Sequence, residues 1–194
     1  MVKGFIFTAC MSFFGTAFSQ DLIGAGLIKT TGSITPGRMV GQPMRNVYFS
    51  GFAEVYTHKK VSFRGDALWY VDGQSKAAQE SWRYARNLSV YFGAFYHFNK
   101  NNWDMHLGFQ PGMAVVVPSG SVQVNPLAKA CPSAAFHVGS TFFVWKYFNF
   151  YADVAYTHTY YRGLNTGSVY LGEVLFTAGL GFNINVLQTK LFQD

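Results

Sequence analysis

The sequence predicts an all-β fold, an eight-stranded antiparallel transmembrane β-barrel, from three observations. Apolar and polar residues alternate in eight stretches, and a period of two is that of a β-strand, whose successive side chains point to opposite faces. The connections between these stretches are short and long in turn. Aromatic residues make up 19% of the 194 residues and charged residues only 12%, whereas about 25% of a typical soluble domain is charged.

The hydropathy of the chain separates a barrel from a helical membrane protein. The mean hydropathy is only +0.10, and after residue 19 the chain contains no run of about 20 apolar residues that could form a membrane-spanning helix. High aromatic content without such a run favours a membrane barrel. A soluble all-β protein is the alternative.

Residues 1–19 predict a signal peptide. Lys3 supplies the positive charge, residues 4–18 are apolar and small, and the segment ends in a small-residue cleavage site. We expect cleavage after Ser19 and export to the bacterial outer membrane, with residues 20–194 forming the barrel.

The predicted strands follow one another along the remaining chain. We expect them, in order, at Leu22–Thr31, Asn46–His58, Val61–Val71, Leu88–Phe98, Trp103–Val115, Ala134–Trp145, Phe148–Tyr161 and Tyr170–Val186. Long connections are expected at Gly32–Arg45, Asp72–Asn87, Val116–Pro132 and Arg162–Val169, and short turns between the other strands. Short turns at one end and long loops at the other are typical of an outer-membrane barrel, whose short turns lie in the periplasm.

The alternation assigns an outward and an inward face to each strand. Phe148–Tyr161 is the clearest case, because one of its faces is almost wholly apolar and aromatic, as suits contact with lipid. In the second and third strands the outward set is Val47, Phe49, Gly51, Ala53, Val55, Val61, Phe63, Ala67, Trp69 and Val71. Nearly every charged residue of the predicted strands falls on the inward face.

These inward charges predict a network inside the barrel. Its members are Glu54, Arg64, Asp66, His97, Asp104, His106, Asp153 and Glu173. A turn centred on Lys59 places Glu54 opposite Arg64, and a turn centred between Lys100 and Asn101 places His97 opposite Asp104. Because an unpaired charge in a narrow interior is costly, we expect the charges to pair and to plug the interior. A proton- or ion-conducting path is the alternative.

The sequence gives little support for catalysis, a metal or a cofactor, and we predict none of them. The five histidines lack the close spacing of a zinc motif, although His97, His106 and His137 could converge inside the barrel, where ion-pair roles are favoured over metal ligation. A lipid A-modifying enzyme needs a serine and a histidine within reach of each other, and no such motif surrounds His158. Cys131 is expected to be a free thiol, because the other cysteine lies in the signal peptide.

One predicted loop carries a candidate contact surface, formed by Trp82, Arg83, Tyr84 and Arg86. Alternating aromatic and basic residues suit anionic headgroups or a protein partner. The alternative is an ordinary aromatic belt with solvated charges. No long basic run occurs, so nucleic-acid binding is not expected.

The export signal, the eight strands, the alternating connections and the final strand Gly179–Val186 resemble the small outer-membrane barrels of the OmpA/OmpX-like class, over residues 20–186. The resemblance implies recognition of the last strand by the barrel-assembly machinery of a Gram-negative cell. One departure is that the chain continues to Asp194 instead of ending on an aromatic residue.

From these observations we expect a non-enzymatic barrel with a structural or interaction role: envelope integrity, adhesion or part of a larger outer-membrane complex. Its expected partners are membrane lipids, including anionic outer-leaflet lipid, and a protein reached through the long loops. A narrow channel for ions or small solutes is the alternative, and a lipid A-modifying enzyme is the third hypothesis.

Overall fold

The computed structural model describes residues 23–75, 83–119, 128–164 and 167–187. Strands make up nearly all of this part of the chain. They are β1 (Leu27–Met39), β2 (Met44–His58), β3 (Val61–Ser75), β4 (Arg83–Lys100), β5 (Trp103–Ser119), β6 (Lys129–Trp145), β7 (Phe148–Leu164), β8 (Gly167–Tyr170) and β9 (Glu173–Asn185). Within the described residues, no helix has the length and apolar character needed to cross a bilayer.

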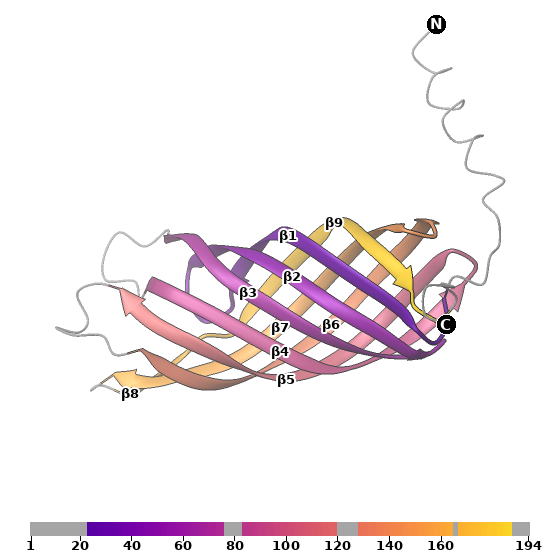
Figure 1. The fold of residues 1–194 in the computed structure, drawn as a ribbon. Helices are drawn as coiled ribbons and strands as arrows, with labels where there is room; N and C mark the ends of the chain where they lie inside the picture. Colours follow the sequence, from indigo (N-terminus) through magenta and orange to yellow (C-terminus); the bar gives the residue numbers. More distant parts are fainter. Residues whose placement is uncertain (1–22, 76–82, 120–127, 165–166, 188–194) are drawn as a thin grey trace, which may run out of the picture.

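The strands close into a barrel (Figure 1). Hydrogen-bonded neighbours follow the order β6-β5-β4-β3-β2-β1-β9-β7, every pair is antiparallel, and a further pairing of β6 with β7 closes the ring. β8 pairs only with the end of β7, so the closed wall has eight strands. The predicted fold class is therefore confirmed. β1 begins and β9 ends at the same end of the barrel, which we call the terminal end, and the opposite end is the loop end.

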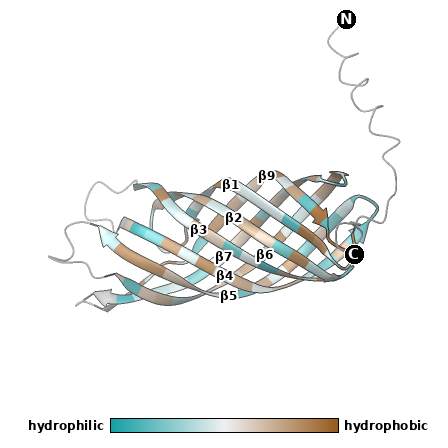
Figure 2. Cartoon of the chain, in the orientation of Figure 1, coloured by the Kyte–Doolittle hydropathy of each residue, from teal (hydrophilic) through white to brown (hydrophobic). Residues whose placement is uncertain are grey.

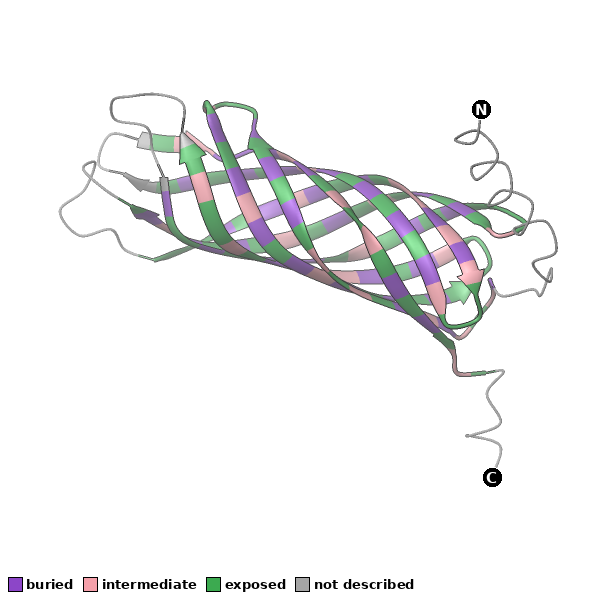
Figure 3. Ribbon diagram, turned by 90° about the horizontal axis from the view of Figure 1, so that it is seen from above, coloured by how far each residue is buried: buried purple, intermediate pink, exposed green. Residues whose placement is uncertain are grey.

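Buried and exposed residues alternate along each strand (Figure 3). In β2, for example, Tyr48 and Glu54 are buried, whereas 61% of Phe49 is exposed. Large apolar side chains remain exposed all around the wall, among them Trp69, Phe92 and Phe136, and hydrophobic and hydrophilic residues are interspersed along the strands (Figure 2). Monomeric soluble proteins rarely expose contiguous apolar surface on this scale, so the outer face is built to contact lipid.

The first strand differs from its predicted position. It starts at Leu27 instead of Leu22 and runs on to Met39, so β1 and β2 are joined by residues 40–43 and not by the long loop expected at Gly32–Arg45. Ser33 and Thr35 of the expected loop face the barrel interior, where Thr35 Oγ1 lies 2.6 Å from Ser50 Oγ. Pro36 lacks an N–H donor, and the β1–β9 ladder is interrupted around it, between the pairs Thr31↔Gly181 and Gly37↔Leu175.

The last predicted strand, Tyr170–Val186, corresponds to β9, and only Tyr170 of the short strand β8 falls within it. β8 and β9 are separated at Leu171–Gly172, where the Leu171 N–H donates to the Thr159 carbonyl and the Gly172 carbonyl accepts from Val40 N–H. β7 extends to Leu164, so the expected loop Arg162–Val169 is mostly strand. β4, β5 and β6 also reach beyond their predicted ends at the loop end. Strands of 13 to 18 residues exceed the roughly 9–11 that cross a bilayer, so part of the wall projects beyond the membrane.

The short turns at the terminal end set the registers. The β2–β3 turn places Glu54 opposite Arg64, as predicted. The β4–β5 turn is centred one residue later than expected, because Asn101 adopts a φ of 54°, a left-handed conformation that asparagine tolerates. Lys100 therefore pairs with Trp103, and His97 lies opposite His106 and not opposite Asp104.

Candidate functional site

Apolar layers close both ends of the barrel interior. At the terminal end, four buried side chains pack together: Ile23, Leu27, Tyr56 and Phe143. At the loop end a larger cluster lies across the interior: Met39, Met44, Tyr84, Ala114, Val116, Cys131, Tyr161 and Leu171. The inward-facing charged side chains of the barrel lie between these two layers or at the boundary of one of them.

Next to the terminal layer, Lys29 lies between two carboxylates. Its Nζ is 2.9 Å from Glu54 Oε2, 4.0 Å from Asp104 Oδ2 and 3.1 Å from Thr141 Oγ1. His97 Nδ1 is 2.9 Å from Asp104, which also accepts a hydrogen bond from the Tyr56 hydroxyl. Lys29, Glu54, His97 and Asp104 are each 0% exposed. Each charge is therefore fully removed from solvent and paired, as buried charges require.

Arg64 forms a second group of ion pairs in the barrel interior. Its Nη2 lies 2.7 Å from Asp66 Oδ1 and its Nη1 lies 3.3 Å from Asp153 Oδ2, while its guanidinium carbon stacks 3.6 Å from the centre of the Phe52 ring. Asp153 also accepts hydrogen bonds from His106 Nε2 at 2.8 Å and from His137 Nδ1 at 2.9 Å. The Arg64 guanidinium thus bridges two carboxylates from opposite parts of the wall.

The structure brings seven of the eight predicted lumen residues together and leaves Glu173 apart. Glu54 faces Arg64 in register, yet its ion-pair partner is Lys29 from β1. Lys29 was not among the predicted network residues, although it is the one charged residue within the predicted first strand. His97 still binds Asp104, but diagonally, because the turn shift sets His106 directly opposite.

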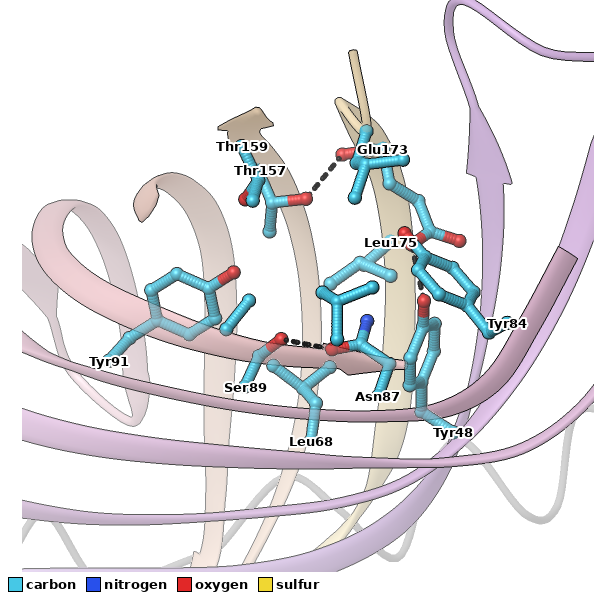
Figure 4. A pocket seen from close by; sticks show the side chains of 13 residues that line it. Tyr48, Leu68, Tyr84, Asn87, Ser89, Tyr91, Thr157, Thr159, Glu173 and Leu175 are labelled. Carbon is cyan, nitrogen blue, oxygen red and sulfur yellow. Dashed lines mark hydrogen bonds between the residues drawn. The ribbon is translucent and has the colours of Figure 1, made fainter. Parts of the chain in front are cut away.

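Glu173 lies nearer the loop end, in a small polar cavity (Figure 4). Its carboxylate accepts hydrogen bonds from the Tyr48 hydroxyl at 2.6 Å and from Asn46 Nδ2 at 2.9 Å. Among the described residues, no cationic side chain forms an ion pair with it. The remaining free volume, about 20 Å³, has room for about one water molecule.

The predicted loop surface is not a single surface. Trp82 lies outside the described residues, and Arg83 is the first residue of β4. Tyr84 is buried in the loop-end layer, whereas Arg86 is exposed on the outer face. The reason is that β4 starts before the expected position and bulges between Tyr84 and Arg86, which sends the two side chains to opposite faces.

Ser62, His97 and Asp104 have the connectivity of a catalytic triad but not its chemistry. Ser62 Oγ lies 2.7 Å from His97 Nε2 and donates its proton to Glu54 Oε1 at 2.5 Å. The hydroxyl must therefore accept from His97 Nε2, and His97 also donates from Nδ1 to Asp104. A histidine that donates from both nitrogens cannot act as a general base, and all three residues are 0% exposed.

One group within the described residues could offer ligands to a metal ion. Possible ligand atoms of His97, Asp104 and His106 lie within 4.8 Å of one another. Asp104 is already bound by His97 and Tyr56, and His106 by Asp153. The Lys29 ammonium 4.0 Å from Asp104 opposes a further cation, so the geometry favours ion pairs over metal ligation.

A closed wall of eight antiparallel strands, apolar outside and filled with side chains inside, is the fold of the small outer-membrane barrels. No protein-family model matches the chain, and none of the curated proteins compared with it matches its sequence.

Solved structures share this fold. The outer membrane protein OprG from Pseudomonas aeruginosa has a TM-score of 0.57 and 11% identity, and the match covers 84% of this chain and 98% of OprG. The N-terminal barrel of OprF from the same organism has a TM-score of 0.55 and 13% identity, covering 83% of this chain and 99% of that domain. Neisserial surface protein A has a TM-score of 0.55 and 15% identity, covering 82% and 96%. At these identities the likeness is one of fold.

Proposed function

We propose that this chain is a closed, non-enzymatic barrel of a bacterial outer membrane with a structural or interaction role in the cell envelope. Residues 1–19 serve as its signal peptide, cleaved after Ser19, and the barrel-assembly machinery inserts it. The apolar outer face and the likeness in fold to solved outer-membrane barrels support this placement.

The layered interior is the observation that carries the proposal. An ion crossing the barrel would meet an apolar layer, then the Lys29–Glu54 and Arg64–Asp153 pairs, then a second apolar layer. Passage would require breaking desolvated ion pairs, which is costly when one partner is left alone. The two small cavities beside Glu173 and beside Arg64 hold about 20 Å³ each, enough for isolated water molecules. Such an interior supports a plug and not a conducting path.

A plugged barrel acts through its surfaces. Its outer wall contacts lipid, and the strands project past the bilayer at the loop end, where the segments 76–82 and 120–127 connect β3 to β4 and β5 to β6. Envelope integrity, adhesion and membership of a larger complex all use such surfaces. We place a protein partner at this end.

Planar-bilayer recording tests the closed interior. The folded protein should insert without giving a steady ion current, while a known porin in the same bilayer conducts. A stable current from the purified barrel would favour the narrow channel instead. Lipid A mass spectra from cells with and without the protein test the absence of enzymatic activity, and a protein-dependent change in acylation would contradict it.

A further inference from the structure

Two arginines face each other on the outer wall near the loop end. Arg38 of β1 and Arg45 of β2 are direct register partners, and both side chains are exposed on the outward face. Like charges directly opposite each other on one face of a sheet destabilise it. Within the described part of the chain, neither arginine forms an ion pair with an acidic side chain. The pair therefore has the geometry of a site that an external anion would stabilise.

These arginines line a groove on the outer surface. The other lining residues include Asn46, Val47, Gly73 and Gln74, and Gln74 is the register partner of Arg45 on β3. Asp72 is the one acidic residue of this lining, and its carboxylate accepts a hydrogen bond from Gly73 N–H at 2.7 Å. The groove thus carries a net positive charge and presents two guanidinium groups, which bind phosphate oxygens in a bidentate manner.

The basic groove continues into an apolar one towards the middle of the membrane. The two grooves share Pro36 of β1 and Phe176 of β9. The apolar groove runs across the wall past Ile34, where Ala152 and Ala178 are direct register partners. A charged end near the level of the headgroups, joined to an apolar channel below it, matches a lipid with an anionic head and an acyl chain.

We propose that Arg38 and Arg45 bind the phosphate of an acylated, phosphorylated glycolipid of the outer leaflet, of the lipid A class, with one acyl chain in the apolar groove beside Ala178. The site rests on the proposed placement in the outer membrane. Charge complementarity selects the phosphate, and the continuous apolar groove distinguishes a lipid from a free anion.

Native mass spectrometry of the detergent-folded protein tests this site with lipid A, dephosphorylated lipid A and inorganic phosphate. We expect lipid A adducts on the wild-type barrel, at least tenfold weaker binding in the R38Q/R45Q variant, and weak binding of the dephosphorylated lipid. R162Q is the matched control, because Arg162 is exposed on β7 at the same end but does not line either groove. Lipid A binding of R162Q should equal that of the wild type.

A second variant separates lipid from free phosphate. A178F fills the apolar groove, so it should weaken lipid A binding severalfold while leaving the phosphate response unchanged. Equal lipid A binding by R38Q/R45Q and the wild type would overturn the proposal, as would an equal loss in R162Q. If A178F bound lipid A as tightly as the wild type, the proposed acyl-chain groove would be wrong, and Arg38 and Arg45 would form a site for an anion alone. Conductance plays no part in this test, so its failure is distinct from failure of the closed-barrel proposal.

Discussion

Lys29 shows how one side chain determines the electrostatics of the interior. It lies within ion-pair distance of Glu54 and Asp104, it is 0% exposed, and it contacts the rings of Tyr56 and Phe143. Two carboxylates from different strands therefore share one ammonium group. Removing that group leaves buried negative charge without its nearest compensation.

Lys29→Met should accordingly destabilise the barrel by about 3–5 kcal/mol, the cost of breaking a buried pair from one side. Urea unfolding in lipid vesicles measures this change. Lys100→Met is the control, because Lys100 is exposed at the β4–β5 turn, and it should stay within about 0.5 kcal/mol of the wild type. Adding Glu54→Gln to Lys29→Met should recover part of the loss. A Lys29→Met variant as stable as the control would refute the role given to this pair.

The Ser62 hydroxyl should be chemically unreactive. Because its proton is held by Glu54 and it is 0% exposed, a fluorophosphonate that labels activated serines should leave the folded barrel unmodified. Intact-protein mass spectrometry measures the label, with a serine hydrolase as the positive control. Modification at Ser62 would show that the Ser62–His97–Asp104 arrangement is accessible and reactive.

At the scale of elements, closely spaced strands depend on particular glycines. A Cβ placed on Gly93 of β4 would lie 2.0 Å from the backbone oxygen of Phe109 on β5, so no side chain fits there without moving the strand. Gly32 of β1 has nothing within 4 Å of the same position. Both glycines lie in strands, but only Gly93 lacks the space for a side chain.

Gly93→Ala should therefore cost about 1–3 kcal/mol through overpacking, whereas Gly32→Ala should be close to neutral. Unfolding titrations of the two variants under identical conditions compare them directly. Equal effects of the two substitutions would mean that β4 and β5 are not as closely packed at Gly93 as the structure indicates.

The elements also show how far the sequence predicts the structure. β2 and β3 could be predicted closely, because each apolar residue alternates with a polar or aromatic one and a two-residue turn joins them. β1 could not be predicted to its full length, because Gly32, Pro36 and Gly37 are typical of turns, and Thr35 is buried only because it faces the polar interior, where its hydroxyl lies 3.0 Å from that of Thr177. The inward charges could be identified from alternation alone. The His97–Asp104 contact could also be predicted, but the Lys29–Glu54 pair could not, because these two residues meet only once the β1–β2 register is known.

At the scale of the whole molecule, closure of the wall and filling of the interior depend on each other. β6 and β7 complete the ring, and ion pairs such as Arg64–Asp153 then connect β3 with β7 across the inside. The apolar layers at the two ends keep water from these pairs and so strengthen them. The result is a barrel that is apolar towards lipid, charged within and closed at both ends.

The most direct test of this account is the gel mobility of the detergent-folded protein with and without boiling. A closed barrel with a desolvated ion-pair layer should resist the gel detergent, so the unboiled protein should migrate as a distinct compact band and shift on boiling. Identical mobility of the two samples, together with a soluble β-rich protein in the absence of detergent, would contradict the lipid-facing closed barrel and every functional proposal based on it.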